Sequence, residues 1–142
     1  MTVAELMPEI VAWNHGPLAL LAGHPLSDPR VVLTVGDVGE AIAAADGAYD
    51  AILLDVDNGP QALSDRGNHR LYGPAGLASA RRALCPGGML AVWSADPAPD
   101  FEQTLAAAGF RAGSVEVSPR GTPDGPMHTI LLGICPEIAR KP

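Results

Sequence analysis

Two carboxylates, Asp55 and Asp57, directly follow a short apolar run at residues 51–54 and precede a turn sequence at residues 58–60. An apolar run of this length, bounded by polar and turn residues, predicts a buried strand. A strand that is covered on both faces belongs to a parallel sheet, and ligands of such sheets bind beyond the carboxyl ends of the strands. The two carboxylates therefore stand where a ligand would bind. The alternative is a structural role, because Asp-x-Asp-Asn-Gly also suits the start of a loop.

Two further acidic residues, Glu5 and Asp37, also follow predicted strands. Glu5 ends a short strand at residues 2–4, and Asp37 follows a β-branched strand at residues 31–35. Asp37 and Glu40 have the spacing of a capping box, which predicts a helix from there to about residue 45. Asp37 is thus a candidate ligand and also a candidate helix cap, whereas the alternative for Glu5 is an exposed acid near the terminus.

The remaining pattern alternates helices and strands, which predicts an α/β fold with a mostly parallel sheet. The last two strands have no helix between them and are expected to form an antiparallel hairpin. We expect a single domain over residues 1–135, followed by a tail at 136–142. The further helices are expected at 8–14, 73–84 and 100–108, the further strands at 89–93, 114–117 and 128–134, a polar loop at 61–70 and a tight turn at 85–88.

The composition limits the class of protein. Acidic residues outnumber basic ones, and the net charge of −7 argues against nucleic acid or an anionic membrane as partner. No apolar run is long enough to span a membrane, and the first residues lack the pattern of a signal peptide, so a cytoplasmic protein is expected. Hydrophobic residues make up 47% of the chain but aromatic residues only 4%, so the core should consist of Ala, Val, Leu and Ile.

The cysteines, histidines and tryptophans show no pattern of a metal or redox site. Cys85 and Cys135 are single and far apart, which is typical of reduced thiols in a core. The four histidines share no spacing with each other or with the cysteines, so no metal site is expected. Trp13 and Trp93 are expected in the core rather than in a stacking site.

Three segments carry a resemblance to a known family. They are DPRVVLTVGD at 28–37, YDAILLDVD at 49–57 and RRALCPGGMLAVW at 81–93. Their order resembles the Rossmann-like fold of class I S-adenosylmethionine-dependent methyltransferases, and within that superfamily it is most similar to spermidine synthases. The resemblance covers nearly the whole chain from its second expected strand onward.

The resemblance implies a role for each acidic residue. Glu5 would accept hydrogen bonds from the ribose hydroxyls of an S-adenosyl nucleoside, which suits a carboxylate facing a cis-diol. Asp37 would hold the adenine amino group, with Val38 against the ring. Asp55 would contact the cofactor and would be the catalytic carboxylate that faces an amine. Asp57 would bind the amine substrate as well, and Tyr72 would line its site.

Two departures from the family pattern stand out. The two aspartates of aminopropyltransferases are usually spaced D-x-x-D, whereas Asp55 and Asp57 are spaced D-x-D. The family's first strand and its glycine-rich loop have no counterpart, and neither has the N-terminal β-domain of spermidine synthases. In this fold the first strand lies in the middle of the sheet, so the strands at 2–4 and 51–54 should each expose an unpaired edge. The two edges could close on each other, another chain could fill the slot, or the chain is a fragment.

The sequence therefore predicts a spermidine synthase-like transferase of polyamine biosynthesis, which moves an aminopropyl group from decarboxylated S-adenosylmethionine to a diamine. The alternatives are a methyltransferase that uses S-adenosylmethionine and a non-catalytic, truncated domain or interaction partner. The expected partner is a small molecule such as a polyamine, with no metal cofactor, and a homo-oligomer is one of the expected assemblies.

Overall fold

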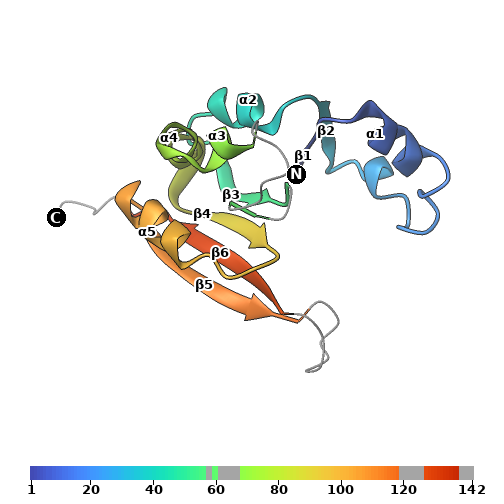
Figure 1. Cartoon of the computed structure of the whole chain (residues 1–142). Coiled ribbons are helices and arrows are strands. Elements are labelled where there is room, and N and C mark those ends of the chain that lie inside the picture. The colour runs from blue at the N-terminus through green and yellow to red at the C-terminus, as the bar shows by residue number, and fades with distance from the viewer. Residues whose placement is uncertain (57–58, 61–67, 119–126, 138–142) are drawn as a thin grey trace. The chain divides into compact units, whose positions relative to one another are not determined.

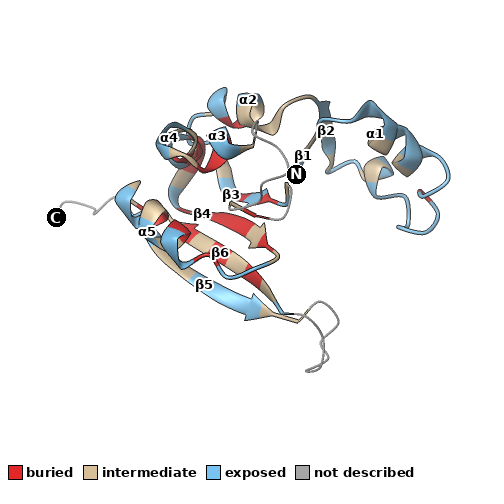
Figure 2. Cartoon of the chain, in the orientation of Figure 1, coloured by how far each residue is buried: buried red, intermediate tan, exposed pale blue. Residues whose placement is uncertain are grey.

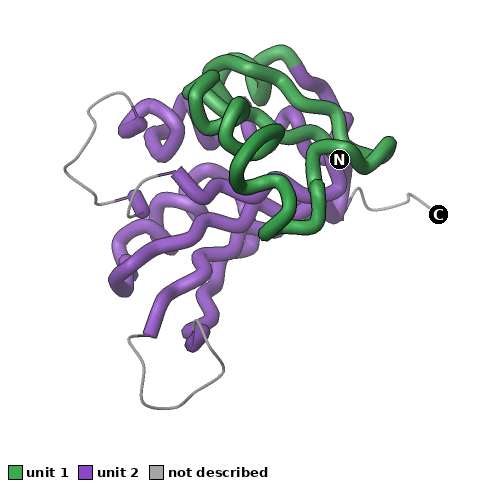
Figure 3. The backbone as a smooth tube through the Cα atoms, turned by 90° about the vertical axis from the view of Figure 1, so that its right-hand side faces the viewer, with its two compact units in different colours: residues 1–44 green, residues 45–142 purple. Residues whose placement is uncertain are grey.

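A computed structural model describes residues 1–56, 59–60, 68–118 and 127–137 of the chain (Figure 1). The chain divides into two compact units, residues 1–44 and residues 45–142 (Figure 3). The single domain expected for residues 1–135 stays a prediction. No helix among the described residues has both the length and the apolar composition that crossing a membrane requires.

The first unit is a parallel pair of strands with short helices. Strand β1 pairs with β2 in a register that runs from Thr2↔Val32 to Glu5↔Val35. The register brings the carboxyl ends of both strands to the same end of the pair. In chain order the elements are β1 (Thr2–Glu5), α1 (Pro8–His15), the 3₁₀ helix η1 (Pro25–Ser27), β2 (Val32–Val35) and α2 (Val38–Ala43).

In its described residues, the second unit consists of a four-stranded mixed sheet and three helices. The strand order is β3-β4-β6-β5, in which β3 and β4 are parallel and the other neighbours are antiparallel. This arrangement confirms the predicted α/β class and the C-terminal antiparallel hairpin. The elements are β3 (Tyr49–Leu54), α3 (His69–Tyr72), α4 (Pro74–Ala83), β4 (Leu84–Ser94), α5 (Pro99–Ala107), β5 (Arg111–Val117) and β6 (His128–Ile134).

The core of the second unit lies on one face of this sheet. The register aligns Leu54, Val92 and Leu131 across three strands, and all three side chains are buried. Helices α4 and α5 contribute the fully buried Leu77 and Leu105. In Figure 2 the buried residues are concentrated on β4, β6 and these helices, whereas β5 is mostly exposed or intermediate. Burial on this scale stabilises the unit mainly through the hydrophobic effect.

A bulge interrupts the pairing of β3 with β4. The partner of Tyr49 is Leu84, but the partner of Ala51 is already Met89, so several residues of β4 bulge out of the ladder. Gly87 has a φ of 79°, and a Cβ on Gly88 would lie 2.8 Å from the carbonyl oxygen of Cys85. The tight turn predicted at 85–88 is therefore corrected: these residues belong to β4 and form its bulge.

Other local predictions need correction. Helix α3 begins at His69, inside the polar loop predicted for 61–70, and residues 61–67 of that loop lie outside the described part of the chain. Trp13 was expected in the core, but its side chain is 51% exposed, and Trp93 is only half-buried. The aromatic residues that the core does contain are Tyr72, Phe101 and Phe110.

The two strands expected to have unpaired edges have a partner on one side only. Within the described residues, β1 pairs with β2 alone, and β3 pairs with β4 alone. Along β3 the buried Ile52 and Leu54 alternate with the exposed Ala51 and Leu53, and Leu53 is 75% exposed. This strand therefore presents a large apolar side chain next to a free edge.

Candidate functional site

Asp55 lies where the sequence predicted it, at the carboxyl end of β3. The strand ends at Leu54, whose partner on the parallel strand β4 is Val92, and the exposed Asp55 follows. The carboxylate can therefore reach a ligand beyond the carboxyl ends of the strands. Asp57, the second predicted carboxylate, lies outside the described residues, and so its predicted role in binding substrate stays a prediction.

Tyr72 fixes the main chain next to Asp55. Its hydroxyl donates a hydrogen bond to the carbonyl oxygen of Val56, with an oxygen–oxygen distance of 3.1 Å. Its ring is buried and makes an edge contact with Phe101, with the ring centroids 5.7 Å apart. The side chain predicted to line the amine site thus has a structural role one residue beyond the carboxylate. Direct contact of Tyr72 with a substrate remains a prediction.

A close approach between Gly59 and Ser94 further fixes this edge of the sheet. Gly59 is buried, and a Cβ on it would lie 2.3 Å from Oγ of Ser94, the last residue of β4. Its φ of 103° also favours glycine. The Ser94 hydroxyl itself donates to the carbonyl oxygen of Asp96 at 2.7 Å. The sequence marked Gly59 only as a turn residue, and no sequence signal pointed to its contact with β4.

Glu5 and Asp37 lie together at one edge of the first unit. The partner of Glu5 in the sheet is Val35, two residues before Asp37, and the backbone N–H of Gly36 donates to the carbonyl oxygen of Glu5 at 2.9 Å. The half-buried Glu5 side chain accepts a hydrogen bond through Oε1 from the N–H of Met7 at 2.8 Å. The two candidate nucleoside ligands thus follow paired strands at the same end of the β1–β2 pair.

Asp37 is the N-cap of α2. Its Oδ1 accepts hydrogen bonds from the N–H groups of Gly39 at 2.7 Å and of Glu40 at 3.3 Å. The cap that the sequence predicted is therefore confirmed, and it satisfies two of the otherwise unpaired N–H groups of the helix terminus. Val38 is the first residue of α2 and is half-buried. The predicted contacts of Asp37 and Val38 with adenine remain predictions.

Among the described residues, neither the ion pair nor the arrangement of possible metal ligands indicates another site. Within the described residues, Oδ2 of Asp28 and Nη2 of Arg30 form an ion pair at 2.6 Å, which lowers the pKa of Asp28 and raises that of Arg30. Arg30 is exposed and Asp28 is half-buried, and the pair precedes β2, away from the carboxyl end of that strand. The described residues contain no group of three or more His, Cys, Asp or Glu that could hold a metal ion.

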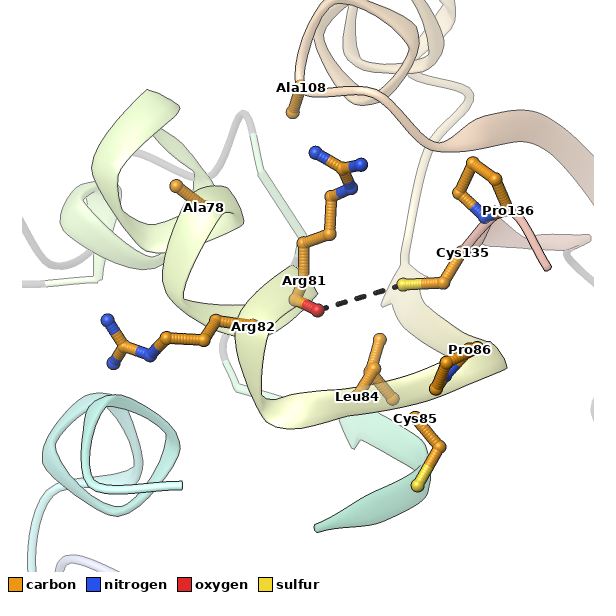
Figure 4. Close-up of a pocket in the computed structure, with 9 residues that line it drawn as sticks. All are labelled: Ala78, Arg81, Arg82, Leu84, Cys85, Pro86, Ala108, Cys135 and Pro136. Carbon is orange, nitrogen blue, oxygen red and sulfur yellow. Dashed lines mark hydrogen bonds between the residues drawn. The ribbon is translucent and has the colours of Figure 1, made fainter. Parts of the chain in front are cut away.

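The second unit also has a pocket of about 330 Å³ (Figure 4). It lies where β4 begins and β6 ends, far from the carboxyl ends of the parallel strands. Its lining residues are Ala78, Arg81, Arg82, Leu84, Cys85, Pro86, Ala108, Cys135 and Pro136. The pocket is therefore not part of the site that the sequence predicted.

The polar groups of this pocket already have structural roles. The Cys135 thiol donates to the carbonyl oxygen of Arg81 at 3.8 Å, and the Cys85 thiol donates to that of Gly47 at 3.1 Å. Burial raises the pKa of Cys135, which the nearby Arg81 partly opposes. The Arg81 guanidinium lies so close to Gly109 that a Cβ there would be 3.1 Å from Nη1. It thus stands beside the end of α5, where a cation complements the helix dipole.

Solved structures with the same fold include spermidine synthases and methyltransferases. The spermidine synthase from Thermotoga maritima aligns with a TM-score of 0.72 at 16% identity, over 94% of this chain and 44% of that one. A spermidine synthase in complex with the transition-state analogue AdoDATO gives 0.69 at 15%, over 94% and 43%. An O-methyltransferase family protein from Burkholderia thailandensis gives 0.60 at 16%, over 96% and 43%. No protein-family model and no curated protein sequence matches the chain.

These comparisons show a fold shared with spermidine synthases and an O-methyltransferase family protein, and they are too distant to establish an activity. The chain spans less than half the length of each of these three structures.

Proposed function

We propose that the chain is a spermidine synthase-like transferase. In this reaction Asp55 binds and deprotonates an amine, which then accepts an aminopropyl group from decarboxylated S-adenosylmethionine. The observation that carries the proposal is the position of Asp55, an exposed carboxylate at the carboxyl end of β3. The hydrogen bond from Tyr72 to Val56 fixes the main chain beside it. A carboxylate that follows a parallel strand in this way can meet an amine substrate at the place where ligands of such sheets bind.

The chemistry explains this requirement. A primary amine has a pKa of about 10, so that at pH 7 the loss of its proton costs about 4 kcal/mol. The free amine then attacks the carbon that the sulfonium activates, and the C–S bond breaks to leave the thioether. Asp55 would hold the ammonium ion by charge, accept its proton and keep the nitrogen in position for attack.

The nucleoside part of the proposal rests on Glu5 and Asp37. Hydrogen bonds within the first unit already orient both carboxylates at one edge of the β1–β2 pair. The bond that Glu5 makes to Met7 uses Oε1. The second oxygen, Oε2, is then the atom that would accept from the ribose hydroxyls. We propose that Asp37 and Val38 hold the adenine, as the resemblance implies.

Methyl transfer from S-adenosylmethionine is the second candidate activity. The D-x-D spacing of Asp55 and Asp57 favours it, because it departs from the spacing usual in aminopropyltransferases. The comparison with an O-methyltransferase family protein is consistent with this activity. A chain that does no chemistry by itself is the remaining alternative.

The first experiment is calorimetric titration of the 142-residue chain with 5′-methylthioadenosine, with circular dichroism on the same sample. This nucleoside contains the adenine, ribose and sulfur common to both candidate cofactors. We expect binding that is lost in Glu5→Ala and Asp37→Ala while the far-ultraviolet spectrum is retained. A folded chain that does not bind would overturn the proposal of a stand-alone transferase.

The second experiment separates the two activities by mass spectrometry of the products. The chain is incubated with a diamine and either decarboxylated S-adenosylmethionine or S-adenosylmethionine. We expect an aminopropylated diamine from the first mixture and a rate about 10²–10⁴-fold lower in Asp55→Asn. Asp50→Asn is the matched control, because Asp50 is an exposed aspartate of β3 that lies before its carboxyl end. A methylated product from the second mixture alone would favour the second candidate.

A further inference from the structure

An indole and an imidazole lie together on the sheet of the second unit, close to Asp55. Trp93 and His128 have ring centroids 4.9 Å apart and ring planes tilted by 47°. Both side chains are half-buried. Nδ1 of His128 is buried and has no hydrogen-bond partner. A buried polar atom without a partner is uncommon in folded proteins. Hydrogen bonding of Nδ1 therefore does not explain why a histidine occupies this position.

The sheet register places Trp93 beside Asp55. The last β3–β4 pair is Leu54↔Val92, so the next residues along the two parallel strands are Asp55 and Trp93. Because side chains alternate along a strand, Asp55 shares the face of Leu53, which is opposite to the face of the buried Leu54. Trp93 lies on that same face, since Val92 belongs to the buried one.

The same face continues as an apolar surface across the sheet. Trp93 pairs with Ile130 on β6, and Leu53 aligns with Ala91 and Leu132. Ile130 and Leu132 are half-buried and Leu53 is exposed, in contrast to the fully buried residues of the opposite face. The exposed carboxylate of Asp55 therefore stands at the border of an apolar, aromatic surface.

We propose that Trp93 determines the specificity for the acceptor: the aliphatic chain of a cationic amine lies along the indole while its reacting nitrogen is held at Asp55. This inference rests on the proposed function, since it concerns the acceptor of the same reaction. An ammonium group close to an indole face is attracted by the negative face of the ring system, and methylene groups pack against it.

His128 acts in this proposal as a positioning residue. Its ring packs against Trp93 and limits the orientations that the indole can adopt. The indole face is then already oriented before the amine binds, which lowers the entropic cost of binding. His128 is the first residue of β6, where it pairs with Val117 of β5, and it directly precedes Thr129, the partner of Ser94 on β4.

The test uses the fluorescence of Trp93 in the full chain. The chain contains two tryptophans, and Trp13 is 51% exposed, so Trp13→Phe leaves Trp93 as the single tryptophan with little effect on the fold. We expect 1,4-diaminobutane to change the Trp93 emission in a saturable way, in the presence of 5′-methylthioadenosine. The uncharged 1,4-butanediol, of similar length, should give no saturable change.

Substitutions then separate the charge effect from packing. We expect Trp93→Leu to weaken calorimetric binding of 1,4-diaminobutane about tenfold, because a cation–π interaction is lost. Trp93→Phe should weaken this binding less than Trp93→Leu, because phenylalanine retains an aromatic ring. For the same reason, His128→Phe should weaken it less than His128→Ala. Binding of 5′-methylthioadenosine should be unchanged in all four variants, a result that a general loss of structure would not give.

The outcomes distinguish this inference from the proposed function. If the diamine binds with equal affinity to the unaltered chain and to Trp93→Leu, and the Trp93 emission does not respond, the inference is overturned and the proposed transferase stands. If the unaltered chain binds 5′-methylthioadenosine but no diamine, the amine acceptor itself is wrong, and both fall. Should Trp93→Leu fail to fold, the emission of Trp93 in Trp13→Phe decides by itself.

Discussion

The two units of the chain are stabilised in different ways. In residues 1–44 the buried hydrophobic side chains are Ala19 and Ile42, whereas Trp13, Leu20 and Leu21 are each more than half exposed. The described part of residues 45–142 contains a core whose largest fully buried side chains are Leu77, Leu90, Leu105, Leu131 and Val92. The first unit is ordered mainly by local hydrogen bonds and one strand pair, and the second by packing. The candidate nucleoside ligands belong to the first unit, and the candidate catalytic carboxylate belongs to the second.

The largest expected effect tests whether packing dominates in the second unit. Leu131→Ala removes a fully buried side chain from the centre of the sheet and should lower the free energy of unfolding by about 2–5 kcal/mol. The matched control is Leu21→Ala, since Leu21 is 84% exposed in the first unit, and its effect should be within about 0.5 kcal/mol. Urea unfolding followed by circular dichroism measures both. Equal losses in the two variants would show that the contrast between the units is wrong.

A smaller effect is expected at the contact between Gly59 and β4. Gly59→Ala adds a Cβ that would collide with Ser94 and places a side chain at a φ of 103°, which should destabilise the fold by about 1–3 kcal/mol. Thermal unfolding of the single variant and of the double variant with Ser94→Gly measures the contribution of the collision. We expect the double variant to recover part of the loss relative to Ser94→Gly alone. No loss in Gly59→Ala would mean that this segment is not held against Ser94.

The smallest effect concerns the local hydrogen bonds of the first unit. Asp37→Ala removes the acceptor for the N–H groups of Gly39 and Glu40 and should cost about 1 kcal/mol. Asp37→Asn keeps a capping oxygen and should lose much less. Chemical denaturation compares the two stabilities, and titration with 5′-methylthioadenosine compares their affinities. If Asp37→Asn retains the stability but not the affinity, the carboxylate has a role beyond the cap.

The sequence was most informative where local patterns determine structure. The strand ahead of Asp55, the cap at Asp37 and the C-terminal hairpin were all predicted, because each depends on an apolar run, a turn or a capping residue. The exposure of Trp13 was missed because hydrophobicity alone does not tell whether a core exists to receive a side chain. The extension of β4 to Leu84 was missed because a turn and a bulge have the same local sequence.

The sequence could predict which residues belong to the candidate site, but not which contacts they make. The sequence identified Glu5, Asp37 and Asp55 from their positions after strands. It could not show that Tyr72 bonds to Val56 or that Trp93 meets His128, because these contacts join segments far apart in the chain. The roles of all these residues in binding and catalysis stay predictions.

The pocket where β4 begins and β6 ends has a practical consequence for labelling the protein. Its two thiols differ in accessibility, because Cys85 is half-buried whereas Cys135 is buried and has a raised pKa. A maleimide dye should therefore attach first to Cys85, and Cys85→Ser would provide an unlabelled reference. A dye at that position lies at the start of β4, away from Asp55, so it could report on folding or association while the carboxyl ends of the strands stay open to ligands.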